Sequence, residues 1–195
     1  MVDILTLNRS SSKIRDIALA WREVLNVNNC YVPDIAWLLE AKLPQLLDAF
    51  SFLVVRSSDL NGDHAKTIFD PPTIITGQEI YTQGCESDPF ARCVLTHEFG
   101  HLVQHETLPK SFSATDRAYR TGPLSMSSEW QADEFTFHFL CPEHIVSGFE
   151  SPEEIAENCR VTEILARRAF DSCVTFQRPR KLPESVSSFL RSFED

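Results

Sequence analysis

Several features that would mark a specialised class of protein are missing from this chain of 195 residues. Its six cysteines include no Cys-x-x-Cys pair and are dispersed along the sequence, which indicates buried, reduced thiols rather than a disulfide framework. No window approaches the roughly 18 uncharged apolar residues of a membrane span. The N-terminus carries Asp3 where a signal peptide needs basic charge. We therefore expect a soluble, cytoplasmic protein with no membrane partner.

Positive charge is also scarce. The chain has 18 Lys and Arg residues against 28 Asp and Glu residues, which gives a net charge of −10. An acidic surface repels phosphate backbones, so we expect no direct binding to nucleic acid. A protein partner of so acidic a chain is expected to carry a basic surface.

The hydrophobic pattern changes its period along the chain. Apolar residues at helical spacing predict N-terminal helices over residues 1–50, one after Ser10 and one after Asp34 that breaks at Pro44. Four short runs then predict strands, at residues 52–55, 67–69, 73–76 and 79–82. We expect them to form a small, twisted, antiparallel sheet, so the fold class is α+β.

Helical signals return after the sheet. Asp88 predicts the N-cap of a helix that runs to about His105, and a loop follows. Ser127 or Ser128 caps the next helix, and these elements complete a core over residues 51–145. Residues 146–195 predict a helical segment packed on that core. Two of its helices resemble a helix-turn-helix, but their glutamates and the net charge favour packing or substrate docking over DNA binding.

The pattern His97-Glu98-Phe99-Gly100-His101 carries the chemistry. Two histidines four residues apart project from one helix face, where both ring nitrogens can reach one Zn²⁺. Glu98 points about 100° away around the helix axis, so it suits a general base that acts on water rather than a ligand. A glycine inside a helix costs stability, which indicates close approach of another element at Gly100. The alternative is a surface histidine pair on an ordinary helix.

A third ligand is predicted in the next helix. Glu129 and Asp133 lie one turn apart on the same face, and zinc peptidases of the Glu-ligand type use such a pair. The first carboxylate completes the metal site, and the second accepts a hydrogen bond from a ligand histidine. The alternative for Glu129 is a carboxylate that the helix dipole favours. Glu134 is a weaker rival ligand, because it faces about 140° away.

Five other residues are weaker candidates. His105 lies one turn beyond His101, and we favour packing or support of the ligands over a place in the cleft. Cys93 lies one turn before His97, where a buried thiol is favoured over a metal contact. An oxyanion stabiliser is expected from the chemistry. The guesses for it all lie in the long loop: Arg117, Tyr119 and Arg120.

Both blocks resemble the ImmA/IrrE family of metallopeptidases. The run over residues 93–105 is similar to that family's active-site helix, and Glu129-x-x-Ala132-Asp133-x-Phe135 resembles its second signature. Asp133 stands where many relatives have Asn. The resemblance extends over residues 52 to about 176, and it implies that His97, His101 and Glu129 bind zinc.

The resemblance also implies a substrate. Members of the family typically cleave a helix-turn-helix repressor and thereby switch on stress-response or mobile-element genes. We expect a zinc-dependent endopeptidase acting on such a repressor, with Mn²⁺ or Fe²⁺ as alternative metals in vivo. The competing hypothesis is a protein that binds a regulator without cutting it, as an antirepressor or a toxin–antitoxin-type partner. The intact Glu98 argues for the enzyme.

Overall fold

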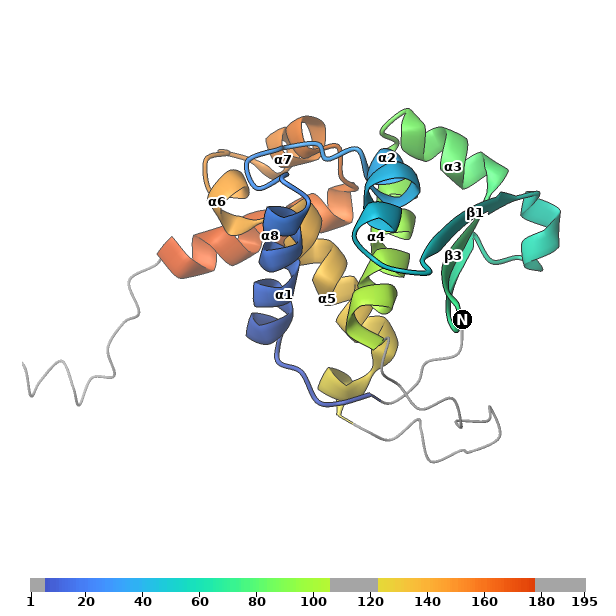
Figure 1. Ribbon diagram of the computed structural model, residues 1–195. Helices are drawn as coiled ribbons and strands as arrows, with labels where there is room; N and C mark the ends of the chain where they lie inside the picture. Colours follow the sequence, from blue (N-terminus) through green and yellow to red (C-terminus); the bar gives the residue numbers. More distant parts are fainter. Residues whose placement is uncertain (1–5, 106–122, 178–195) are drawn as a thin grey trace, which may run out of the picture.

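The computed structural model describes residues 6–105 and 123–177 (Figure 1), and their class is α+β as predicted. The N-terminal region holds α1 (Ser11–Val24), α2 (Ile35–Trp37), a π turn (Leu38–Lys42) and a 3₁₀ turn (Leu43–Gln45). The sheet region holds β1 (Ser51–Val55), a 3₁₀ turn (Ser57–Leu60), β2 (Ala65–Phe69) and β3 (Pro72–Gly77). The remaining elements are α3 (Gln78–Cys85), α4 (Pro89–His105), a 3₁₀ turn (Leu124–Met126), α5 (Ser128–Leu140), α6 (Glu143–Val146), α7 (Pro152–Cys159) and α8 (Glu163–Gln177).

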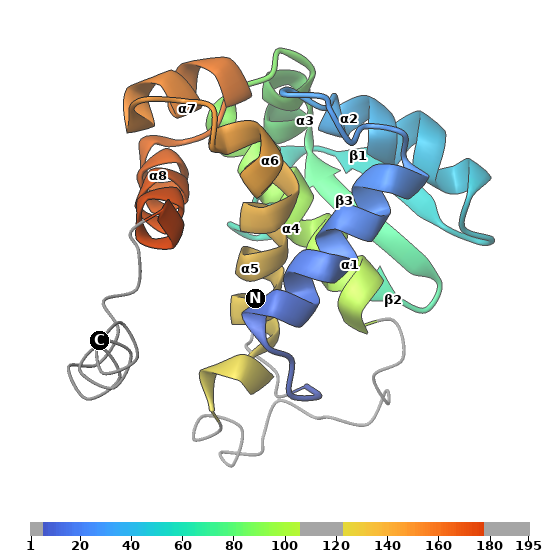
Figure 2. The same ribbon diagram turned by 90° about the vertical axis from the view of Figure 1, so that its left-hand side faces the viewer.

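The antiparallel helices α4 and α5 form the centre of the molecule, with the sheet on one side and α7 and α8 on the other (Figure 2). Gly100 of α4 permits their close contact. A Cβ atom there would lie 3.2 Å from Cβ of Phe135 and 3.3 Å from Cα of Ala132. The predicted close approach at this glycine is confirmed. Phe99, which is 2% exposed, packs edge-on against Phe135 beneath the same contact.

The local signals at the helix ends are confirmed. Ser10 accepts a hydrogen bond from the amide of Lys13, and Asp88 accepts one from the amide of Ala91. Ser127 caps α5 through the amide of Trp130. A side-chain acceptor at these positions satisfies amides that have no partner within the helix. The break at Pro44 is also confirmed, because the helical run ends in the 3₁₀ turn that contains it.

The sheet differs from the prediction in two ways. Its strand order is β1-β3-β2, with β1 and β3 parallel and β2 and β3 antiparallel, so the expectation of an antiparallel sheet was wrong for β1. Residues 79–82 are not a strand but belong to α3, where Ile80 and Gly84 form one buried face. A run of four residues is too short to distinguish the period of a strand from that of a helix. Gly84 lies in a tightly packed place, where an added Cβ atom would be 2.7 Å from Leu95.

One hydrophobic core joins all three stretches of the chain. It draws Ile14 and Ala18 from α1, Leu95 from α4, Phe139 from α5 and Ala166 from α8. The division at residues 50 and 145 stays a prediction.

All six cysteines are free, but only Cys141 and Cys159 are buried and Cys85 is exposed, so the expectation of buried thiols was wrong for most of them. Within the described part of the chain, no helix has the length and apolarity that crossing a bilayer requires.

A buried guanidinium ties α1 to this core. Arg22 is 0% exposed and donates to the carbonyl oxygens of Phe139, Val27, Asn28 and Cys30, at 2.6 to 3.0 Å. Burial lowers the pKa of Arg22 to about 10, which leaves the group charged at neutral pH. The guanidinium group therefore donates hydrogen bonds to a carbonyl group in the last turn of α5 and to three carbonyl groups in the segment after α1.

Replacing Arg22 with alanine is expected to lower the free energy of unfolding by about 2–4 kcal/mol, because one buried and three partly buried carbonyl groups lose a charged donor. Urea denaturation followed by circular dichroism measures the change. Arg15→Ala is the matched control, since its side chain is 40% exposed on the same helix. A loss below about 1 kcal/mol for Arg22→Ala would show that these hydrogen bonds contribute little.

Candidate metal centre

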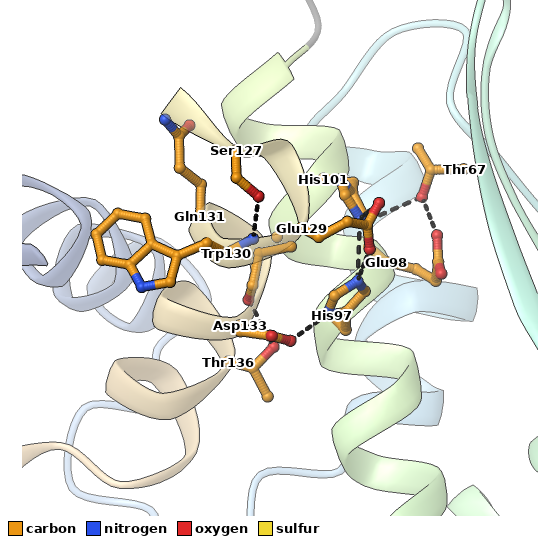
Figure 3. A network of polar contacts seen from close by, with 12 residues as sticks. Thr67, His97, Glu98, His101, Ser127, Glu129, Trp130, Gln131, Asp133 and Thr136 are labelled. Carbon is orange, nitrogen blue, oxygen red and sulfur yellow. Dashed lines mark hydrogen bonds and ion pairs between the residues drawn. The ribbon is translucent and has the colours of Figure 1, made fainter. Parts of the chain in front are cut away.

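Helices α4 and α5 bring the three predicted ligands together (Figure 3). One ligand atom from each of His97, His101 and Glu129 lies within 4.8 Å of the others. His97 Nε2 is 3.0 Å from His101 Nε2 and 3.2 Å from Glu129 Oε2, and His101 Nε2 is 3.5 Å from Glu129 Oε1. The helical spacing therefore places both imidazoles on one face, and α5 adds the carboxylate opposite them.

These separations fit a divalent cation. Four ligands about 2.05 Å from a tetrahedral Zn²⁺ are about 3.3 Å from one another. The two distances from His97 Nε2, 3.0 Å to His101 Nε2 and 3.2 Å to Glu129 Oε2, are close to that edge length, and the other Glu129 oxygen is 3.5 Å from His101 Nε2. Two imidazoles and a carboxylate form the donor set of a catalytic zinc site, in which the fourth position is left for water or substrate. The cluster thus has the chemistry and the spacing to hold a metal ion.

Asp133 lies behind the cluster in the predicted place. Its Oδ1 accepts a hydrogen bond from Nδ1 of His97 at 2.9 Å, one turn along α5 from Glu129. This contact fixes the ring and turns Nε2 of His97 toward the other two groups. The N-cap at Ser127 fixes the first turn of α5, which carries Glu129.

Glu98 is turned out of the cluster and held by a residue that the sequence did not point to. The hydroxyl of Thr67, in β2, lies 2.7 Å from Oε2 of Glu98 and 3.0 Å from its carbonyl oxygen. Glu98 is 4% exposed, and this burial raises the pKa of its carboxyl group, while Thr67 and the two imidazoles oppose the rise. A buried carboxyl group with a raised pKa beside a candidate metal centre suits proton transfer.

A cleft of about 530 Å³ opens over these groups. Its polar part includes His97, Glu98, Glu129 and Asp133, and its rim is formed by residues 62–65 before and at the start of β2. The side facing them is formed by α8. The candidate metal centre is therefore open to a substrate.

A comparison of the sequence with models of known protein families identifies the family of this chain. The family model for peptidase M78, described as the IrrE N-terminal-like domain, matches residues 48–169, which is more than half of the chain. The chain belongs to the M78 peptidase family. No curated protein matches it. The matched range includes α4 and α5, which carry the candidate metal centre of this M78 peptidase, together with α7, and it ends within α8.

Membership of the M78 family gives this protein a protease role in general and implies a metal, for which the His97, His101 and Glu129 group is available. The suspected resemblance to ImmA/IrrE peptidases is thereby confirmed. The assignment of each residue as a ligand or a base stays a prediction.

The rival groups in this M78 peptidase lie away from the cluster. Glu134 is buried on the other side of α5, where it pairs with Arg168 and accepts a hydrogen bond from Ser11 at 2.6 Å. His138 lies 3.1 Å from the same serine hydroxyl. The structure therefore separates Glu134 and His138 from the cluster of His97, His101 and Glu129.

His105 and Cys93 have different surroundings. His105 is 1% exposed, and its ring centroid is 5.5 Å from that of His101, so it packs beside the ligand, as favoured from the sequence. Burial lowers the pKa of His105 to about 3, and it is neutral at physiological pH. Cys93 lines the cleft, and burial raises the pKa of its thiol. The three loop candidates Arg117, Tyr119 and Arg120 lie outside the described residues.

The imidazoles and carboxylates of the cluster shift one another's pKa values. Burial alone would lower the pKa of His97, but its hydrogen bonds with Asp133 and Glu129 raise it to about 9. Burial would raise the pKa of Glu129, but its hydrogen bonds with His101 and His97 lower it. At neutral pH, His97 is therefore protonated and Glu129 ionised.

Metal binding at neutral pH is expected to release about one proton, because the cation must displace the proton of His97. The raised pKa means that this proton is bound below about pH 9, so metal affinity should increase with pH up to that value. Calorimetric titration with Zn²⁺ in buffers of different ionisation enthalpy measures the released proton. Binding heats that do not depend on the buffer would contradict the prediction.

Proposed function

We propose that this M78 peptidase is a zinc-dependent endopeptidase of the Glu-ligand zincin type that cleaves a helix-turn-helix repressor. The observation that carries the proposal is the cluster of His97, His101 and Glu129 beside the buried carboxyl group of Glu98. These three groups would hold Zn²⁺, with Mn²⁺ or Fe²⁺ as alternatives. When bound, the metal supplies Lewis-acid chemistry by polarising the scissile carbonyl and lowering the pKa of water.

The protein's own groups perform the proton transfers. Glu98 takes the proton of the attacking water and then delivers it to the leaving amine. Thr67 holds the Glu98 carboxylate by its hydrogen bond of 2.7 Å. Asp133 keeps His97 in the tautomer that presents Nε2 to the centre. Together they pre-position the reacting groups.

The edge of the sheet supports a substrate bound in an extended conformation. Among the described residues β2 is an edge strand of the sheet, and the amide of Gly77 donates to the carbonyl oxygen of His64 at 3.0 Å. Because hydrogen bonding alternates along an antiparallel pair, the backbone groups of Ala65 and Thr67 point to the open edge. Ala65 also lines the cleft. A peptide could therefore add to this edge as a strand.

Charge supports a basic substrate. Four carboxyl groups line the cleft, from Asp63, Glu98, Glu129 and Asp133, against one guanidinium from Arg168 and the imidazoles of His64 and His97, and the chain has a net charge of −10. DNA-binding repressors carry the opposite charge, so long-range attraction would favour their encounter with this cleft. The identity of the repressor comes from the family resemblance.

Incubation of the zinc-loaded protein with the helix-turn-helix repressor encoded beside it tests the proposal. We expect the wild type to produce two repressor fragments and Glu98→Gln to produce none. Mass spectrometry of the fragments identifies the cleaved bond. If both proteins relieve repression equally and no fragments form, the protein acts by binding its partner and the protease proposal is wrong.

A further inference from the structure

The helix-turn-helix-like hairpin formed by α7 and α8 is a wall of the cleft. Thr162, Ile164, Leu165 and Arg168 from this hairpin line the same cavity as the candidate metal ligands. Ile164 is 84% exposed, the highest value among the exposed large hydrophobic side chains of the described residues, and it lies at the cleft. Its exposure is explained if the side chain contacts a substrate.

This wall is anchored to both active-site helices. Arg168 pairs with the buried Glu134 of α5, and its guanidinium lies 4.0 Å from the ring centroid of Phe137. Arg92 of α4 is 0% exposed and donates from Nε to the carbonyl oxygen of Arg160 at 3.0 Å, between α7 and α8. Arg168 of α8 and Arg92 of α4 therefore fix the hairpin to the peptidase core.

Apolar groups of α4 stand across from this wall. Cys93 and Val94 line the cleft and precede His97 by four and three residues. That spacing puts their side chains on the helix face of His97, about one turn or 5.4 Å away. Cys93, Val94, Ile164 and Leu165 are the large apolar groups of a cleft lining that is otherwise polar or made of small residues. A substrate side chain that contacts them lies about one helical turn from His97, and so belongs to a residue close to the reacting bond.

We propose that Val94, Cys93, Leu165 and Ile164 form a subsite for one aliphatic side chain beside the scissile bond, and that Ile164 determines this specificity. The subsite deepens the proposed function and rests on it, since the metal centre fixes where the bond is cut. The hairpin thus selects the cleavage site within a protein substrate. A repressor would be cut next to a leucine, isoleucine or valine that an extended segment presents to the cleft.

Binding of two small hydroxamates to the zinc-loaded full chain tests the subsite without a known substrate. One probe is a malonyl hydroxamate with an isobutyl side chain, and the other is the same compound without that side chain. We expect the isobutyl probe to bind the wild type about ten- to a hundredfold more tightly, because the subsite buries the added group. Zinc stoichiometry is measured first, by calorimetry.

The variant Ile164→Glu should reduce the ratio of the two probes' affinities about tenfold, while zinc and the unsubstituted probe still bind. It should fold, because the residue is exposed and an acidic group is favourable in the first turn of α8. Leu53→Glu is the control, since Leu53 is 47% exposed on β1 and does not line the cleft. It should retain the full preference.

Two results would overturn the subsite. Equal binding of the two probes by the wild type would show that no aliphatic pocket adjoins the metal. A preference that Ile164→Glu leaves unchanged would show that α8 does not determine it. A protein that binds no zinc would instead overturn the proposed function, and the subsite with it, so the two failures are distinguishable.

Discussion

Glu98→Gln is expected to reduce the rate of repressor cleavage by about 10²–10⁴-fold and to leave the zinc content unchanged. Glutamine keeps the size of the side chain but cannot accept the proton of water. The metal should stay, because the Glu98 carboxylate lies against Thr67 rather than in the ligand cluster. Cleavage is measured by the time course of fragment formation, and zinc by elemental analysis of the same sample.

Two further variants make the Glu98 result interpretable. Glu79→Gln changes an exposed carboxylate on α3 and should cleave at the wild-type rate. Thr67→Val removes the hydroxyl group that holds Glu98 and should lower the rate less than Glu98→Gln does. If Glu98→Gln retained more than about a tenth of the rate, general-base catalysis by this residue would be wrong.

Glu129→Ala is expected to weaken zinc binding by more than about 10³-fold, because one of three protein ligands is removed. Asp133→Asn should weaken it by about 10–100-fold, since only the support of His97 is altered. Competition with a chromogenic chelator measures both affinities on one scale. The order of the two losses separates a ligand from a residue that orients one.

Glu134→Gln is the control for these variants. The sequence leaves Glu134 as a rival ligand, but the structure buries it on the other side of α5 against Arg168. Zinc affinity should therefore equal that of the wild type. A large loss for Glu134→Gln together with a small loss for Glu129→Ala would reverse the assignment of the third ligand.

Helical periodicity is the reason why so much of the site could be predicted. Four-residue spacing alone places His97 with His101 and Glu129 with Asp133, whatever the rest of the fold does. The contact between the two pairs needs α4 and α5 to pack closely, and Gly100 was the only local sign of it. Thr67 gave no sign at all. It lies 31 residues before Glu98, and a threonine in a short strand has many ordinary explanations.

The same distinction between local and long-range information applies to the fold. Caps at Ser10, Asp88 and Ser127 are decided by side chains within three residues, and the sequence predicted Asp88 itself and the short serine runs that contain the other two. The parallel pairing of β1 with β3 depends on contacts between segments about twenty residues apart, which strand periodicity does not encode. The hairpin of α7 and α8 was predicted as helices, but its place as a cleft wall was visible only from its contacts with α4 and α5.

Anomalous diffraction at the zinc absorption edge, from crystals of the zinc-loaded protein, tests the central claim most directly. We predict one strong peak, about 2.0–2.1 Å from Nε2 of both His97 and His101 and about 2.0–2.2 Å from the Glu129 carboxylate. Glu98 should lie outside the bonding distance of the metal. A peak at another set of residues, or no peak between α4 and α5, would contradict the metal centre on which this account rests.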